Sequence, residues 1–213
     1  MRTDDLIGML ATGAGPVAAH GVERRYGLAL AGGLVGAAVL MLTFLRVRPD
    51  LAGAVLLPMF WVKVGFVGSL AVASLLAVLR LSRPGVRLAW MPGAMLLPVV
   101  LIWVIAGVSL IEAEPLQRRG LFFGVTWKSC PLLIALLSVP VFVGVMWAMR
   151  GGAPTRARLA GFVAGLLSGA TAALVYCLHC PELAAPFVGF WYLLGMLIPA
   201  GVGALLGPRL LRW

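Results

Sequence analysis

Three cysteines, at positions 130, 177 and 180, are the residues of this sequence best suited to specific chemistry. Cys130 and Cys180 are each followed by proline, which favours the first position of a helix. Each of these two thiols is therefore expected to cap the start of a helix, where the helix dipole stabilises a thiolate and lowers the thiol pKa. Cys177 is expected to pack as a small apolar side chain in the last turn of its helix.

A pair of activated thiols supports two kinds of chemistry. The thiols can close a disulfide if their Cα atoms approach within about 7 Å. They can also bind a soft metal ion such as Cd²⁺ or Zn²⁺, and the candidate ligands are Cys130, Cys180 and His179. Inert burial of the cysteines inside helices is the alternative to both.

Few other residues suggest a reaction. Lys63 is the only charged residue inside an apolar stretch, and its long side chain is expected to reach the membrane interface beside Phe60 and Trp61. His20 and His179 are expected on opposite sides of the membrane, so they cannot share a metal ion or form a catalytic pair. The sequence also lacks paired carboxylates, a P-loop and a nucleophile motif. We therefore expect no enzymatic activity and no resident cofactor.

The elements that must position the thiols are membrane-spanning helices. Of 213 residues, 62% are apolar and 11% are charged, and the mean hydropathy is +1.06, far from the balance of a soluble domain. A span needs about 20 apolar residues, and six stretches are long enough: 26–45, 58–79, 88–111, 131–149, 159–178 and 186–206. The sequence predicts an all-α polytopic membrane protein, with a bundle of six transmembrane helices over residues 26–213.

The basic residues between these stretches predict the orientation. The formal net charge of +10 would suit a nucleic-acid partner, but the charges lie in the loops, so the lipid bilayer is the expected partner and direct contact with nucleic acid is not expected. One side of the predicted membrane collects eleven Lys and Arg residues and the other side five. Because cytoplasmic loops carry the excess, both termini are predicted to be cytoplasmic and Cys130 and Cys180 to lie on the outer side.

Residues 1–25 are predicted to form a cytoplasmic segment that contains a short helix. Two aspartates near its start argue against a signal peptide and suit the first turn of a helix that follows a threonine N-cap. A helix of about two turns is marginal alone, so it is expected to become ordered by docking on a partner. The predicted docking residues are Thr3, Asp4, Asp5, Leu6, Ile7 and Leu10.

Small residues recur at four-residue spacing in three of the stretches, which indicates close helix packing. Packing within the chain is the favoured interpretation, and a dimer face is the alternative. The three ridges are Gly161, Gly165 and Gly169; Gly65, Ser69, Ala73 and Ala77; and Gly203 and Gly207.

The sequence contains several short motifs that are distributed over its whole length. They are Thr3-Asp4-Asp5-Leu6-Ile7, Arg48-Pro49-Asp50-Leu51, Leu57-Pro58-Met59-Phe60-Trp61-Val62-Lys63, Cys130-Pro131, His179-Cys180-Pro181-Glu182, and the run from Gly195 to Arg209. Together they resemble the NrsF-type membrane anti-sigma factors of proteobacteria.

This resemblance implies a function. It implies an inner-membrane protein with six spans that holds an extracytoplasmic-function sigma factor inactive and releases it under heavy-metal or oxidative stress. It also implies that a cysteine pair, matched here by Cys130 and Cys180, senses the stress, and it explains the N-terminal segment as the sigma-factor docking site. Cys177 is not part of that pair, and its closeness to Cys180 leaves open a local metal site of Cys177, His179 and Cys180.

We therefore expect a sensor and transducer, in which oxidation or metal binding draws the outer ends of the fourth and sixth spans together and weakens the cytoplasmic contact. One alternative is a quinone-linked thiol oxidoreductase of the outer face, although such enzymes normally need two redox-active cysteine pairs. Another is a metal-ion transporter with an entry site at Cys130, His179 and Cys180, although the spans lack a continuing line of ligands.

Overall fold

The computed structural model describes residues 3–12, 21–83, 90–152 and 154–211, and these residues form helices and connecting segments without a strand. Six of the helical stretches are long and apolar enough to cross a membrane. They run over Gly21–Leu45, Pro58–Leu81, Met91–Glu112, Cys130–Met149, Ala157–Tyr176 and Ala185–Leu210. The predicted all-α fold with six spans is therefore confirmed, and most span boundaries lie within a few residues of the predicted ones.

The first and last spans are each built from more than one helical segment. The first consists of α2 (Gly21–Leu40) and the π-helix η1 (Met41–Leu45), and the last of α9 (Ala185–Phe187), the π-helix η2 (Val188–Tyr192) and α10 (Leu193–Leu210). The other four spans are α4 (Pro58–Leu81), α5 (Met91–Glu112), α7 (Cys130–Met149) and α8 (Ala157–Tyr176). In the described part of the chain, three short helices lie outside the spans: α1 (Thr3–Thr12), α3 (Leu51–Ala54) and α6 (Pro115–Phe123).

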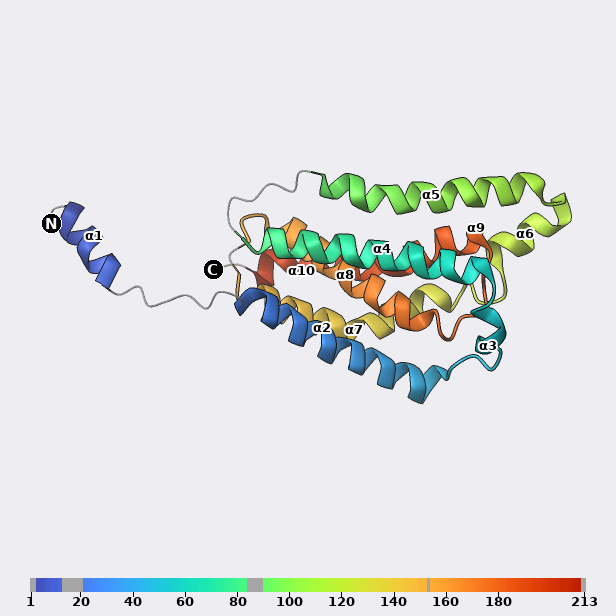
Figure 1. Ribbon diagram of the computed structural model, residues 1–213, viewed down its shortest axis with the longest axis horizontal. Helices are drawn as coiled ribbons and strands as arrows, with labels where there is room; N and C mark the ends of the chain where they lie inside the picture. The colour runs from blue at the N-terminus through green and yellow to red at the C-terminus, as the bar shows by residue number, and fades with distance from the viewer. Residues whose placement is uncertain (1–2, 13–20, 84–89, 153, 212–213) are drawn as a thin grey trace.

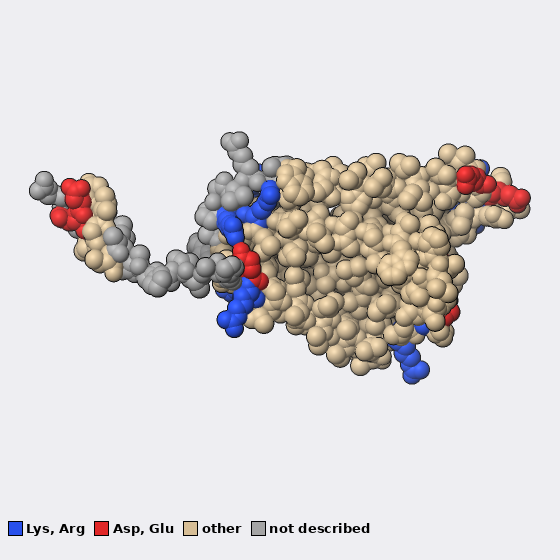
Figure 2. Space-filling model, in the orientation of Figure 1, with Lys and Arg blue, Asp and Glu red and all other residues tan. Residues whose placement is uncertain are grey.

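The spans lie side by side, and the connections between them gather at two ends (Figure 1). One end, here called the terminal end, carries both chain termini (Figure 1). The opposite end, here called the cysteine end, carries the connections 46–57, 113–129 and 177–184. Lys, Arg, Asp and Glu gather at these two ends, while the flank between them is free of such residues in the view of Figure 2. This distribution suits a bundle whose flank contacts hydrocarbon.

Helix α8 is the centre of the bundle, with 83% of its span buried, and it packs against α4, α7 and α10. The small-residue ridge of α8 makes the closest of these contacts. A side chain added at Gly161 would collide with the carbonyl oxygen of Gly203, and one added at Gly165 with that of Pro199. The ridges of α8 and α10 therefore pack within the chain, as the favoured interpretation predicted.

The N-terminal helix α1 lies apart from the bundle, beyond the terminal end (Figure 1). It confirms the predicted short helix, although it begins at Thr3, so that this residue is helical, and the two aspartates fall in its first turn. Ile7 and Met9 expose 59% and 60% of their surface. An apolar helix surface of this kind is available for a partner.

The contact between α8 and α10 yields a first prediction, in which Gly161→Ala destabilises the protein. The added methyl group overlaps the backbone of α10, and overpacking of this kind costs about 1–3 kcal/mol. The midpoint of thermal unfolding in detergent micelles measures the effect. Gly201→Ala is the matched control, because a methyl group at this α10 position meets nothing within 4 Å. Equal stability of the two variants would contradict the prediction.

Candidate sensing site

The thiols of Cys130 and Cys180 meet at the cysteine end, although the two residues are 50 positions apart in the sequence. Cys130 is the first residue of α7, and Cys180 belongs to the connection 177–184 between the last two spans. Both residues are completely buried, and their thiols lie within hydrogen-bonding reach of each other. No disulfide joins the two residues in this structure. The pair is therefore already assembled before any bond forms.

The helix-capping prediction for these thiols is wrong in detail. Cys130 occupies the first turn of α7, but the N-cap is Ser129. Cys180 caps no helix, because the next helix starts only at Ala185. The proline after Cys180 continues an extended connection instead, so the following residues never reach helical geometry at that point. A different source must tune the Cys180 thiol.

That source is the neighbouring thiol together with a buried lysine. A hydrogen bond with Cys130 lowers the pKa of the Cys180 thiol, burial opposes this shift, and the positive charge of Lys63 adds to the lowering. Cys177 behaves differently, since its burial raises the pKa of its thiol to about 11. Cys177 is 1% exposed and belongs to the apolar core, in agreement with the prediction that it packs as a small apolar side chain.

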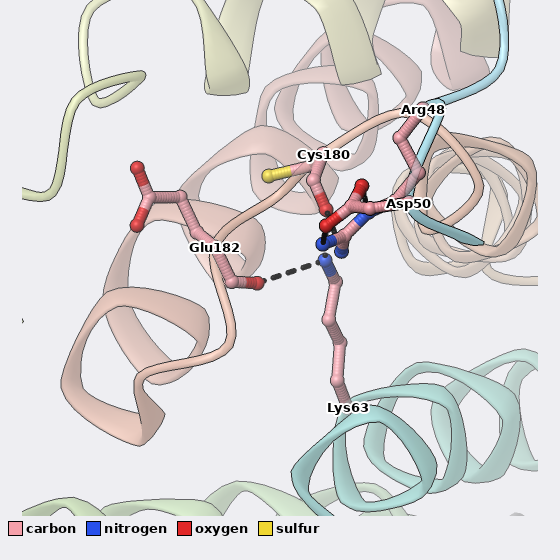
Figure 3. A network of polar contacts seen from close by, with 5 residues as sticks. All are labelled: Arg48, Asp50, Lys63, Cys180 and Glu182. Atoms are coloured by element: carbon pink, nitrogen blue, oxygen red, sulfur yellow. Dashed lines mark hydrogen bonds and ion pairs between the residues drawn. The ribbon is translucent and has the colours of Figure 1, made fainter. Parts of the chain in front are cut away.

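Lys63 of α4 does not reach the interface as predicted, because its side chain turns into the protein and is completely buried. Its Nζ atom donates hydrogen bonds to the carbonyl oxygens of Cys180 at 3.1 Å and Glu182 at 3.0 Å (Figure 3). The same atom lies 4.8 Å from the centre of the Tyr192 ring, in a cation–π contact. The Lys63 side chain does not extend to the interface because the connection 177–184 places carbonyl acceptors within its reach.

Arg48 approaches the same connection from the segment that follows the first span. Its Nη1 atom donates to the carbonyl oxygen of Cys180 at 3.3 Å. Two further nitrogens grip the Asp50 carboxylate, with Nε 2.7 Å from Oδ1 and Nη2 2.6 Å from Oδ2. This hydrogen-bonded pairing lowers the pKa of Asp50. These two hydrogen bonds to Asp50 fix the plane of the Arg48 guanidinium group. Its Nη1 atom therefore remains directed at the carbonyl oxygen of Cys180.

The segment 124–126 covers the thiol pair from another side. Thr126 Oγ1 lies 3.9 Å from Cys180 Sγ, and the Glu182 carboxylate accepts a hydrogen bond from the backbone of Val125 at 2.7 Å. Gly124, with a φ of +55°, lets the chain turn against that carboxylate. Both thiols are buried beneath this cover and do not open onto the surface of the cysteine end.

Tyr192 of η2 closes the site from within the bundle. It is completely buried and lies close enough to interact with the thiols of Cys177 and Cys180. Its hydroxyl makes no well-formed hydrogen bond to the residues that the structure describes. The thiol pair is therefore lined by the ring of Tyr192, the hydroxyl of Thr126 and the nearby charge of Lys63. No carboxylate of the described residues is bonded to either thiol.

The candidate metal ligands do not form a set of three, because His179 does not join the two cysteines. Nδ1 of His179 lies 2.8 Å from the carbonyl oxygen of Arg46, which holds the imidazole at the edge of the connection. Within the described ranges, no three His, Cys, Asp or Glu residues form a group that could hold a metal ion. Neither His179 with Cys130 and Cys180 nor His179 with Cys177 and Cys180 is thus assembled in this structure. His20 lies outside the described residues.

Sequence reasoning missed the roles of Lys63, Arg48 and Tyr192. A signal for Lys63 was present, because it is the only charged residue in a predicted span, and such residues mark functional sites by default. Arg48 and Asp50 stand in one motif, but only the fold shows that they meet Cys180. No pattern in the sequence indicated that Tyr192 would pack against the thiols.

Comparison with known proteins adds a second line of information. A family model described as negative regulator of sigma F matches residues 10–213. The chain is 66% identical to the probable anti-sigma-F factor NrsF of Azospira oryzae and 43% identical to the anti-sigma-F factor NrsF of Caulobacter vibrioides, each over the full length of both proteins. No solved structure matches the chain.

The burial of the cysteines yields a second prediction, in which a maleimide in detergent micelles modifies them slowly. Modification requires local opening, and an opening step of about 1.4 kcal/mol already slows it about tenfold. Val125→Cys is the reference, because Val125 lies at the same end and is 91% exposed. Mass spectrometry follows the modification of each thiol. Native cysteines that react as fast as the introduced one would contradict the burial.

Proposed function

The chain belongs to the NrsF family of negative regulators of sigma F, and from this premise we propose that it is a membrane-bound anti-sigma factor whose thiol pair senses stress. It retains an extracytoplasmic-function sigma factor at the terminal end and releases it when oxidation or a soft metal ion links Cys130 and Cys180. The names of both relatives are those of regulators and not of enzymes. The protein acts by binding and release.

The observation that carries this proposal is the direct approach of two buried thiols at the end opposite α1, one from the start of α7 and one from the connection 177–184. Disulfide formation shortens their contact to a sulfur–sulfur bond of about 2.05 Å. Since the two thiols already lie against each other, the change at the site is small, and the outer ends of the fourth and sixth spans need to approach each other only slightly.

A small change suffices if the bundle has two packings of similar free energy. Lowering sigma-factor occupancy from about 99% to about 50% needs a differential of only about 2.7 kcal/mol between the two states. A disulfide stabilises whichever packing brings the sulfurs to bonding distance, and a soft metal ion held by the two thiolates acts in the same direction.

The route from the thiols to the sigma factor runs through the first span. The connection around Cys180 is bonded to Arg46 and Arg48, which directly follow η1. At its other end the first span leads back along the chain toward α1. A displacement of the connection therefore moves the span from which the docking helix extends.

Charge distribution supports the orientation of this arrangement. Among the described residues, more arginines belong to the terminal end than to the cysteine end, and Lys and Arg side chains are visible at the terminal end in Figure 2. Cytoplasmic loops of bacterial inner-membrane proteins are enriched in basic residues. The terminal end then faces the cytoplasm, where the sigma factor is, and the cysteine end faces the periplasm.

Replacing the thiols tests the sensing step. Cys130→Ser, Cys180→Ser and the double variant should each keep transcription from sigma-dependent promoters low when cadmium or chromate is added, whereas the unmodified protein should respond. Cys177→Ser is the matched control and should keep the response, because Cys177 is no member of the pair. A normal response of the double variant would reject the sensing step.

Replacing the apolar surface of α1 tests the docking step. Ile7→Asp places a carboxylate on a 59% exposed apolar position, and loss of a central contact of this kind weakens binding about tenfold or more. Co-purification of the sigma factor from solubilised membranes measures the loss. Leu116→Asp is the control, since Leu116 is 92% exposed but lies on α6 at the cysteine end. If the Ile7→Asp variant and a chain lacking residues 1–12 both retain all of the sigma factor, the docking site does not lie on α1.

A further inference from the structure

The carbonyl oxygen of Cys180 accepts hydrogen bonds from two buried cations. Lys63 Nζ approaches at 3.1 Å and Arg48 Nη1 at 3.3 Å, and the two residues are 0% and 8% exposed. They reach this oxygen from different elements, since Lys63 belongs to α4 and Arg48 to the segment after the first span (Figure 3). Hydrogen bonds from ionised donors are about twice as strong as neutral ones.

This arrangement is costly, because a buried ammonium loses its hydration. Two simpler roles for Lys63 do not account for it. Its side chain is completely buried and so does not extend to water, and no carboxylate among the described residues forms an ion pair with it. What the ammonium contacts is the backbone at Cys180 and Glu182 and the ring of Tyr192.

We propose that Lys63 and Arg48 are positioning residues of the thiol pair, which hold the peptide unit of Cys180 so that its thiol stays against that of Cys130. This inference rests on the proposed sensing function. The side chain of Cys180 branches from the atom next to the held carbonyl carbon, so fixing the carbonyl limits where the sulfur can lie. Backbone hydrogen bonds tie the N–H group of Cys180 to Tyr176 at 3.0 Å. Among the described residues, the donors to its carbonyl oxygen are the side chains of Lys63 and Arg48, which hold the other side of the residue.

Positioning matters because a disulfide has strict geometry, with Cα atoms within about 7 Å and a sulfur–sulfur torsion near 90°. In the test reaction, diamide accepts two electrons and two protons from the thiols of Cys130 and Cys180. The two S–H bonds break, one S–S bond forms, and the N=N bond of diamide is reduced to a hydrazine. Once local opening has admitted diamide to the buried site, a pair of thiols held against each other closes quickly, while a pair whose relative position varies closes slowly.

The experiment measures the rate of this closure in membranes that contain the full chain, with Cys177→Ser in every variant so that only two thiols remain. Lys63→Gln and Arg48→Gln should each slow closure about tenfold or more, because small misplacement of reacting groups has effects of this size. Lys63→Arg should restore much of the rate, since it keeps a cationic donor. Lys128→Gln is the matched control and should close normally, because the Lys128 ammonium lies 5.4 Å from the centre of the Trp127 ring and, among the described residues, forms no ion pair.

Membrane-inserted protein and its thermal midpoint are quantified for each variant, so that a loss of fold is not mistaken for a loss of positioning. If Lys63→Gln does not reach the membrane, Arg48→Gln decides the outcome. Closure at the unmodified rate in the folded glutamine variants would overturn the proposal. The same would follow if Lys63→Arg closed as slowly as Lys63→Gln.

The closure assay contains no sigma factor, which separates this inference from the proposed function. If closure depends on Lys63 and Arg48 but oxidation leaves sigma-dependent transcription unchanged, the positioning role stands and the sensing function fails. If oxidation releases the sigma factor and the glutamine variants close normally, the sensing function stands and the positioning role fails.

Discussion

The structure of the cysteine end depends on one constraint, which is that buried backbone carbonyls need hydrogen-bond donors. A connection at the edge of a bilayer has little water to satisfy them, and each unsatisfied group costs several kcal/mol. The connection 177–184 meets this demand with the side chains of Lys63 and Arg48, which bond the carbonyls of Cys180 and Glu182. Because these hydrogen bonds fix the carbonyl group of Cys180, they also limit where its thiol can lie.

The helices supply the frame within which those donors can reach their acceptors. The glycines of α8 let α10 approach to backbone contact, and α7 packs against both helices. Because Cys130 starts α7 and Cys180 lies between α8 and α10, this packing also sets the distance between the thiols. Close packing of this kind leaves few intermediate arrangements, which favours two discrete states over a continuous deformation.

The sequence predicted the six spans well, because length and hydropathy decide whether a helix crosses a bilayer. It also predicted that Cys130 and Cys180 lie at one end, since the number of spans between them fixes this. It failed for Lys63 and for the cap at Cys180, because both depend on the path of the connection in space. A lysine near a span end extends to water unless acceptors lie nearby, and no local pattern around Lys63 reveals the carbonyls of residues 180 and 182.

The end of the first span shows why the connection can transmit a change. The span ends in the π-helix η1, and Arg46, which follows it, has a φ of +66°, a conformation that costs a non-glycine residue free energy. Such a conformation persists only if its surroundings hold it, and His179 contacts the Arg46 carbonyl while the backbone of Arg48 bonds that of Leu178. The contacts that restrain this strained turn therefore belong to the same connection as Cys180. A movement of that connection would therefore change the contacts that hold the turn at the end of the first span.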